Sequence, residues 1–131
     1  PRPPIAIGAL GPVMLKHTAR HADIWNSLSF AETFEKQLLE TRDRMNLLDE
    51  HCAAIGRDPA TLRRSYVVLD QSSRDSGGAI SYYASPEAFI ELVEQVIEIG
   101  ITEIVLHYPL VEREMPVFEQ IATEIIPKLK Q

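Results

Sequence analysis

Short apolar segments alternate four times with longer amphipathic segments along this chain of 131 residues. The short segments are predicted strands at 5–8, 22–26, 65–69 and 101–107, and apolar residues at helical spacing follow each of them. Strands that alternate with helices form a parallel sheet with right-handed crossovers. The pattern therefore predicts one α/β domain over 1–131, built as a small open parallel sheet or as four consecutive units of a (βα)8 TIM barrel.

Capping residues, prolines and glycines mark the ends of the predicted helices. Pro12 suits a first helical position, and Ser29 with Glu32 predicts a capping box that opens a long helix ending before Gly56. A further helix runs from Ser85 to Gly100, and the last begins near 114. Helical spacing predicts that the following side chains face the core: Leu15, Ala19, Met45, Leu48, Cys52, Ile55, Phe89, Val93, Ile97, Phe118, Ala122, Ile125 and Leu129.

Charge and composition exclude several classes of function. The net charge is −6 and the basic residues are dispersed, so nucleic acid is not expected as a partner. Apolar runs stay short of the roughly 20 residues that span a bilayer, so we expect a cytoplasmic protein without a membrane segment. The single cysteine, Cys52, excludes an internal disulfide and is interpreted as a buried, inert thiol. No His, Asp or Glu cluster has metal-ligand spacing.

The candidate binding site is the loop that follows the first strand. Gly8, Ala9, Leu10, Gly11 and Pro12 lead from this strand into the first helix. Glycines let the backbone approach a ligand, and the free N–H groups of a helix N-terminus, together with the helix dipole, favour a phosphate. The sequence therefore predicts an anion site here, although a loop of this kind often serves only to turn the chain.

Three segments resemble the luciferase-like monooxygenase superfamily of flavin- or deazaflavin-dependent oxidoreductases. They are PIAIGALGP at 4–12 running into ARHADIWN at 19–26, CAAIGRDPAT at 52–61, and SPE at 85–87 followed by GITEIVL at 100–106. The resemblance implies the C-terminal half of a (βα)8 barrel acting on a small-molecule substrate. It also implies that the loop from Gly8 to Pro12 holds the phosphate end of FMN or of the deazaflavin coenzyme F-420. The position after Pro12, often basic in relatives, is Val13.

Further side chains are candidates for contact with a substrate or with the cofactor ring. Trp25 and Asn26 end the second predicted strand and are predicted to share one face, against which a flat ring could rest, with core packing of Trp25 as the alternative. His107 ends the fourth predicted strand, on the side where barrel active sites lie. His17 and His21 have the chemistry of proton carriers, but structural roles are preferred for both. No residue is assigned a catalytic role.

Half of a barrel has two unpaired sheet edges and one apolar face without a partner. We therefore expect a homodimer that forms through the exposed barrel edges. The same reasoning gives the alternative function, a non-catalytic half-barrel that self-associates or binds a ligand. The loop at 70–84, which is polar and glycine-bearing, is given no role.

Overall fold

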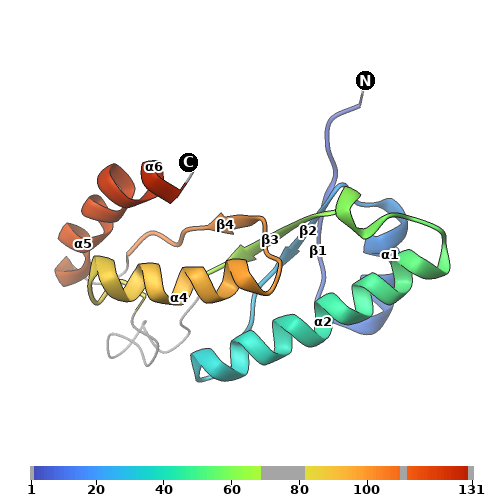
Figure 1. Cartoon of the computed structure of the whole chain (residues 1–131), viewed down its shortest axis with the longest axis horizontal. Helices are drawn as coiled ribbons and strands as arrows, with labels where there is room; N and C mark the ends of the chain where they lie inside the picture. Colours follow the sequence, from blue (N-terminus) through green and yellow to red (C-terminus); the bar gives the residue numbers. More distant parts are fainter. Residues whose placement is uncertain (1, 69–81, 110–111, 130–131) are drawn as a thin grey trace.

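Four parallel strands form one sheet in the computed structural model, which describes residues 2–68, 82–109 and 112–129 (Figure 1). The order of the strands in the sheet follows the chain, and each strand pairs in parallel with the next. A doubly wound sheet reverses its strand order at a switch point, whereas a barrel does not. The sheet has the order of a half TIM barrel, and its strands are β1 (Ala6–Gly8), β2 (Ile24–Ser27), β3 (Arg63–Val67) and β4 (Glu103–Val105).

The helices follow the strands in the expected alternation and contact one another in chain order. Helix α1 packs on α2, α2 contacts α4, and α4 contacts the last helical segment. In Figure 1, α2 and α4 run along the same side of the sheet. The α-helices are α1 (Pro12–His21), α2 (Phe34–Ala54), α4 (Pro86–Glu98), α5 (Met115–Gln120) and α6 (Ile126–Leu129), and the shorter helical pieces are η1 (Pro59–Thr61), η2 (Glu112–Glu114) and the π-helical η3 (Ile121–Ile125).

Side chains alternate between the two faces of the sheet. On β3, Arg64 pairs with Asp49 of α2 and Tyr66 donates a 2.8 Å hydrogen bond to Gln37 of α2, so both point toward the helices. Trp25 is aligned with Arg64 and shares this helix-covered face. The opposite face, which we call the open face, carries a row of aligned residues from all four strands: Gly8, Asn26, Ser65 and Glu103.

The core lies between the sheet and its helices. Six of its largest side chains, all less than 2% exposed, come from both layers: Trp25, Tyr66, Phe89, Leu15, Leu48 and Ile121. The buried side chains of α2 include Met45 and Cys52, as its apolar spacing predicts. Cys52 is 0% exposed, which confirms its predicted burial, and this burial raises the pKa of its thiol.

Both predicted glycine stops are confirmed, and each glycine has a positive φ. Gly56 follows α2 at φ 72°, and Gly100 follows α4 at φ 112°. A Cβ at Gly100 would lie 2.9 Å from the terminal methyl carbon of Met45, whereas one at Gly56 would meet no atom within 4 Å. Gly100 is therefore required by its conformation, and a Cβ there would also make the flexible end of the Met45 side chain shift.

The start of α2 was predicted wrongly. The helix begins at Phe34, and the side chain of Thr33 caps it by accepting from the N–H of Lys36. Ser29 is buried in the preceding loop, where its hydroxyl donates to Glu40 at 2.5 Å and accepts from the N–H of Ala31. Because its hydroxyl is engaged in the loop, Ser29 does not act as the predicted cap.

The inward face of the last helix was also predicted wrongly in part. Ala122 and Leu129 are exposed, while Ile121 is fully buried. The π-helical turn η3 lies between α5 and α6, and its wider turn shifts the buried stripe relative to the α-helical spacing assumed for the sequence. Ile55 and Ile97, also predicted to face the core, are 43% and 46% exposed.

Candidate functional site

The loop after β1 is fastened to the neighbouring strand β2. The N–H of Ala9 donates to the carbonyl of Asn26 at 3.3 Å, which extends the pairing of β1 beyond Gly8. The indole Nε1 of Trp25 donates back to the carbonyl of Ala9 at 2.9 Å. Ala9 is 4% exposed, so this end of the loop belongs to the core. The two hydrogen bonds hold Ala9 in place, and the remainder of the loop, Leu10 and Gly11, leads from it to α1.

Helix α1 begins without a side-chain cap. Gly11 is its N-cap, Pro12 is its first residue, and the N–H of Leu15 makes the bond to the carbonyl of Gly11 that starts the helical ladder. The N–H groups of Val13 and Met14 precede that bond and have no acceptor within the helix. These two N–H groups and the positive end of the helix dipole are what the site offers to an anion.

The glycines of the loop leave its backbone accessible. Neither Gly8 nor Gly11 is among the described glycines with a positive φ, so backbone conformation does not require them. A Cβ at Gly11 would meet nothing within 4 Å, and one at Gly8 would lie 3.9 Å from the carbonyl oxygen of Asn26. Space beside Gly11 is therefore open to a ligand, and Val13 next to it is 70% exposed.

Trp25 and Asn26 lie on opposite faces of the sheet, which corrects the prediction that they share one. Burial alternates along β2, since Trp25 is 0% exposed while Asn26 is partly exposed. Adjacent residues of a strand point to opposite sides, and the sequence-based expectation overlooked this. The indole belongs to the core, which was the alternative interpretation. Asn26 lies on the open face, where its Oδ1 accepts from the hydroxyl of Ser65 at 3.1 Å.

His107 follows β4 rather than ending it, because the strand stops at Val105. The carbonyl of His107 accepts a 2.5 Å hydrogen bond from the hydroxyl of Tyr83. Burial raises the pKa of Tyr83 to about 12, so its hydroxyl remains a donor at neutral pH. Tyr83 thus fixes the main chain at His107, two residues beyond the edge strand. On the open face, Asn26 lies in the same row as Glu103. His107 follows Glu103 by four residues, so Asn26 and His107 are not in one row.

The other candidate groups are placed away from this loop or on the surface. His17 and His21 are exposed one turn apart on α1, with ring centroids 6.4 Å apart and planes at 14°. Among the residues that the structure describes, no group of His, Cys, Asp or Glu could hold a metal ion. In the same part of the chain, no helix combines the length and apolar character needed to cross a membrane.

The sequence did not predict a buried polar cluster that is centred on Gln37. Gln37 is 0% exposed, and its Oε1 accepts from the hydroxyls of Tyr66 at 2.8 Å and Tyr82 at 3.1 Å. Its amide nitrogen donates to the carbonyls of Ser29 and Ala31. Its sequence signal is its spacing, because Met45 and Leu48 of the predicted apolar stripe follow it at 8 and 11 residues on the same face of α2. Of the loop at 70–84, residues 70–81 lie outside the described residues, and Tyr82 and Tyr83 join its far end to the core.

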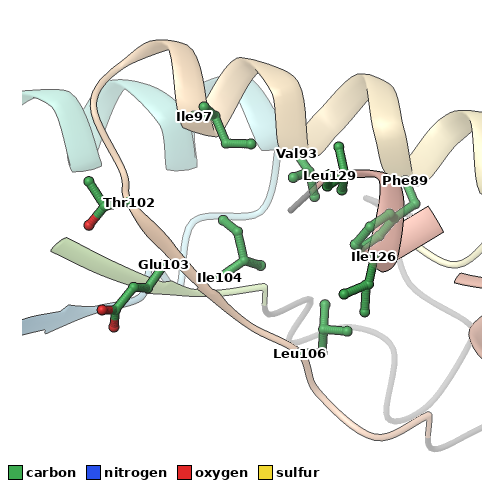
Figure 2. A pocket seen from close by; sticks show the side chains of 9 residues that line it. All are labelled: Phe89, Val93, Ile97, Thr102, Glu103, Ile104, Leu106, Ile126 and Leu129. Atoms are coloured by element: carbon green, nitrogen blue, oxygen red, sulfur yellow. The ribbon is translucent and has the colours of Figure 1, made fainter. Parts of the chain in front are cut away.

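An apolar groove of about 460 Å³ lies on the helix side of the edge strand β4 (Figure 2). Figure 2 shows side chains of α4 on one side of it, side chains of β4 and the following residue opposite, and α6 at one end. Two polar residues lie at the other end. The lining residues are Phe89, Val93, Ile97, Ile104, Leu106, Ile126 and Leu129, with Thr102 and Glu103 as the polar pair.

Comparison with solved structures supports the half-barrel architecture. The coenzyme F420 dependent tetrahydromethanopterin reductase from Methanopyrus kandleri matches with a TM-score of 0.66 and 15% sequence identity. The match covers 95% of this chain and 50% of the reductase, so the chain spans about half the length of that protein. At this identity the likeness shows the fold alone. No protein-family model matches the sequence, and no curated protein matches it either.

Proposed function

We propose that this chain is the C-terminal half of a luciferase-like barrel and contributes part of the cofactor site of a flavin- or deazaflavin-dependent oxidoreductase. The observation that carries the proposal is the loop from Gly8 to Pro12, which ends at an uncapped helix N-terminus. In barrel enzymes the active site is built at the carboxyl ends of the strands, and this loop leaves the carboxyl end of β1. The position of the loop, at the carboxyl end of β1, and its free backbone N–H groups therefore both support a cofactor phosphate site.

The phosphate end of the cofactor is the part that these residues fit. Backbone N–H groups of Val13 and Met14 are donors, and the absence of a side chain at Gly11 leaves room beside them. The ring end has less support within the described residues, because Trp25 is fully buried. Asn26 on the open face, and His107 beyond β4, remain the proposed contacts for the ring or for a small-molecule substrate.

The deazaflavin is the cofactor that we favour over FMN. The matching reductase is described as dependent on coenzyme F420, and this supports hydride transfer rather than monooxygenation as the chemistry of the parent barrel. A bound deazaflavin supplies that hydride chemistry, while the chain orients the phosphate end of the cofactor. We propose a cytoplasmic enzyme that acts on a small molecule and binds neither nucleic acid nor membrane.

Fluorescence titration of the purified chain with coenzyme F420 and, separately, with FMN tests the proposal. We expect saturable binding of the deazaflavin below about 100 µM, corresponding to a binding free energy of about −5.5 kcal/mol. Gly11→Leu places a large side chain beside the donors and should abolish binding, whereas Leu39→Ala, at an exposed position of α2, should leave it unchanged. Failure of both cofactors to bind the folded chain at this concentration would contradict the proposed cofactor site.

A second candidate function is a non-catalytic half-barrel that self-associates, and the two edges of the sheet favour it. In the part of the chain that the structure describes, β1 and β4 each pair with a strand on one side only. Unpaired strand edges are templates for pairing with another chain. A chain that associates with itself but binds neither cofactor would support this function over the first.

A further inference from the structure

We propose that Gly8, Asn26 and Ser65 form a subsite on the open face that binds a carbonyl oxygen of the cofactor ring, with Asn26 as the donor and Ser65 as its positioning residue. This inference rests on the proposed function and deepens it, because it assigns the ring end of the cofactor to named residues. The three residues are aligned on β1, β2 and β3, which are neighbours in the sheet. Gly8 is the last residue of β1, so the row lies near the carboxyl end of that strand, where barrel active sites are built.

The side-chain amide of Asn26 is oriented by its neighbour on β3. Its Oδ1 accepts from the hydroxyl of Ser65 at 3.1 Å. A carboxamide is planar and carries its oxygen and its nitrogen on opposite sides of the bond to Cβ, so an oxygen held toward β3 turns Nδ2 toward β1 and Gly8. Within the described part of the chain, no residue accepts a hydrogen bond from this nitrogen. Asn26 is partly exposed, and its amide therefore presents N–H donors to a ligand on the open face.

Ser65 is well placed to hold this orientation because it is itself fixed. It is 4% exposed, and its carbonyl accepts from the hydroxyl of Ser27 at 2.8 Å. Ser27 follows Asn26 on β2 and points to the other face, so β2 and β3 are joined by a serine hydroxyl from each side of the sheet. The Asn26 amide is thus oriented before a ligand arrives, which lowers the entropic cost of ordering it on binding.

Gly8 leaves the β1 side of Asn26 without a side chain. It is not among the described glycines with a positive φ, and a Cβ there would lie 3.9 Å from the carbonyl oxygen of Asn26, so conformation and packing both permit a side chain. Its absence lets a flat ring approach the backbone beside Asn26. Gly8 also begins the loop that ends at the N-terminus of α1, so the subsite adjoins the proposed phosphate site. This continuity favours the cofactor ring over a separate substrate, and flavin and deazaflavin rings both carry carbonyl oxygens.

NMR titration of the isotope-labelled chain tests the inference, because the side-chain N–H signals of Asn26 and the backbone signals of the loop are both observed. Coenzyme F420 should shift both sets, whereas inorganic phosphate, which has no ring, should shift the loop signals alone. If coenzyme F420 shifts only the loop signals, the ring subsite is overturned and the phosphate site stands. If it shifts only Asn26, the subsite stands and the phosphate assignment is overturned. Movement of neither set up to about 1 mM overturns both.

Substitutions separate the positioning role of Ser65 from a purely structural one. Ser65→Ala should raise the dissociation constant of coenzyme F420 about 3- to 10-fold, as expected for one neutral hydrogen bond, and Ser65→Thr, which keeps the hydroxyl, should restore it. Asn26→Asp keeps the acceptor for Ser65 but removes the donor, so it should weaken binding at least as much as Ser65→Ala does. The matched control is Tyr66→Phe, which deletes a buried hydroxyl on the helix-covered face of β3 and should bind as the parent does.

Gly8→Val gives an independent route, because it fills the space beside Asn26 without touching Ser65. It should abolish the shift of the Asn26 signal by coenzyme F420, while inorganic phosphate still shifts the loop signals. Circular dichroism shows whether each variant is folded, and Asn26→Asp tests the donor if Ser65→Ala does not fold. Parent-like binding by Asn26→Asp, equal weakening in Ser65→Ala and Ser65→Thr, or an unchanged Asn26 shift in Gly8→Val overturns the inference.

Discussion

The indole Nε1 of Trp25 donates a 2.9 Å hydrogen bond to the carbonyl of Ala9, and this bond joins the centre of the core to the proposed phosphate loop. Trp25 is 0% exposed and Ala9 is 4% exposed, so the bond is shielded from water. Its loss would leave a buried carbonyl without its partner. The position of the loop thus depends on a side chain of the next strand along the chain.

Trp25→Phe removes this bond and part of the indole volume. We expect the free energy of unfolding to fall by about 1–3 kcal/mol, from the unsatisfied carbonyl and the cavity together. Deazaflavin affinity should fall as well, because the loop loses its anchor. Tyr66→Phe is the matched control, since it deletes a buried hydroxyl on β3 that bonds α2. Equal loss of affinity in both variants would contradict the specific link between Trp25 and the loop.

Val13 stands in the first turn of α1 and offers a test of the charge at the site. It is 70% exposed, so a charged side chain is tolerated there. A lysine at the N-terminus of the helix adds attraction for a phosphate and a glutamate adds repulsion, each worth about 0.3–1 kcal/mol. Val13→Lys should therefore tighten cofactor binding about 2- to 5-fold, and Val13→Glu should weaken it by a similar factor.

The same pair of substitutions at Leu39 controls for net charge. Leu39 is 59% exposed on α2, and both of its charged variants should bind the cofactor as the parent does. Fluorescence titration at low ionic strength measures all four variants. If the two Val13 variants do not change the cofactor affinity in opposite directions, or if the Leu39 variants show the same changes in affinity, the phosphate lies elsewhere.

Gly100 should tolerate alanine less well than Gly56 does. Both have a positive φ, which costs a non-glycine residue about 1–2 kcal/mol. Only at Gly100 would the new Cβ also approach the terminal methyl carbon of Met45, at 2.9 Å. Urea unfolding should therefore show a larger loss for Gly100→Ala, and Met45→Ala should cost less in that background than alone. A Gly56→Ala variant at least as destabilised as Gly100→Ala would contradict the packing argument.

Stability should depend on Asp23 in acid. The side-chain hydrogen bonds from Arg2, with the N–H of Ile5 donating at 2.7 Å, lower the pKa of Asp23 to about 2. The unfolded value is about 3.9, so this carboxylate stabilises the fold fully above about pH 4 and loses its effect as pH falls toward 2. Asp23→Asn should lack this part of the acid-induced loss in urea midpoint. Arg2→Ala should reduce it, and a parent-like profile in both variants would contradict the assignment.

Much of the fold could be predicted because periodicity and chain breakers act locally. The strand–helix alternation, the proline at the start of α1 and the glycines after α2 and α4 all follow from residues within a few positions. The start of α2 could not be predicted in this way, because Ser29 is engaged by Glu40, eleven positions away. The buried face of the last helical segment depends on a π-turn that α-helical spacing does not indicate.

The sequence predicted the loop of the candidate site, but it did not predict which of the surrounding side chains are buried. Gly8 to Pro12 form the expected connection between β1 and α1, because glycines and a proline specify it locally. The burial of Trp25 depends on the helix-covered face of the whole sheet, and the roles of Gln37 and Tyr82 depend on segments brought together by folding. Choosing a barrel over a doubly wound sheet required the observed strand order.

Amide NMR spectra of the isotope-labelled chain, recorded during titration with coenzyme F420, test the central claim most directly. If the uncapped N-terminus of α1 holds the phosphate, the backbone N–H signals of Gly11, Val13 and Met14 should shift first and most strongly, while those lining the groove beside β4 stay in place. Saturation of the chain without movement of these three signals would contradict the assignment of the loop as the cofactor phosphate site.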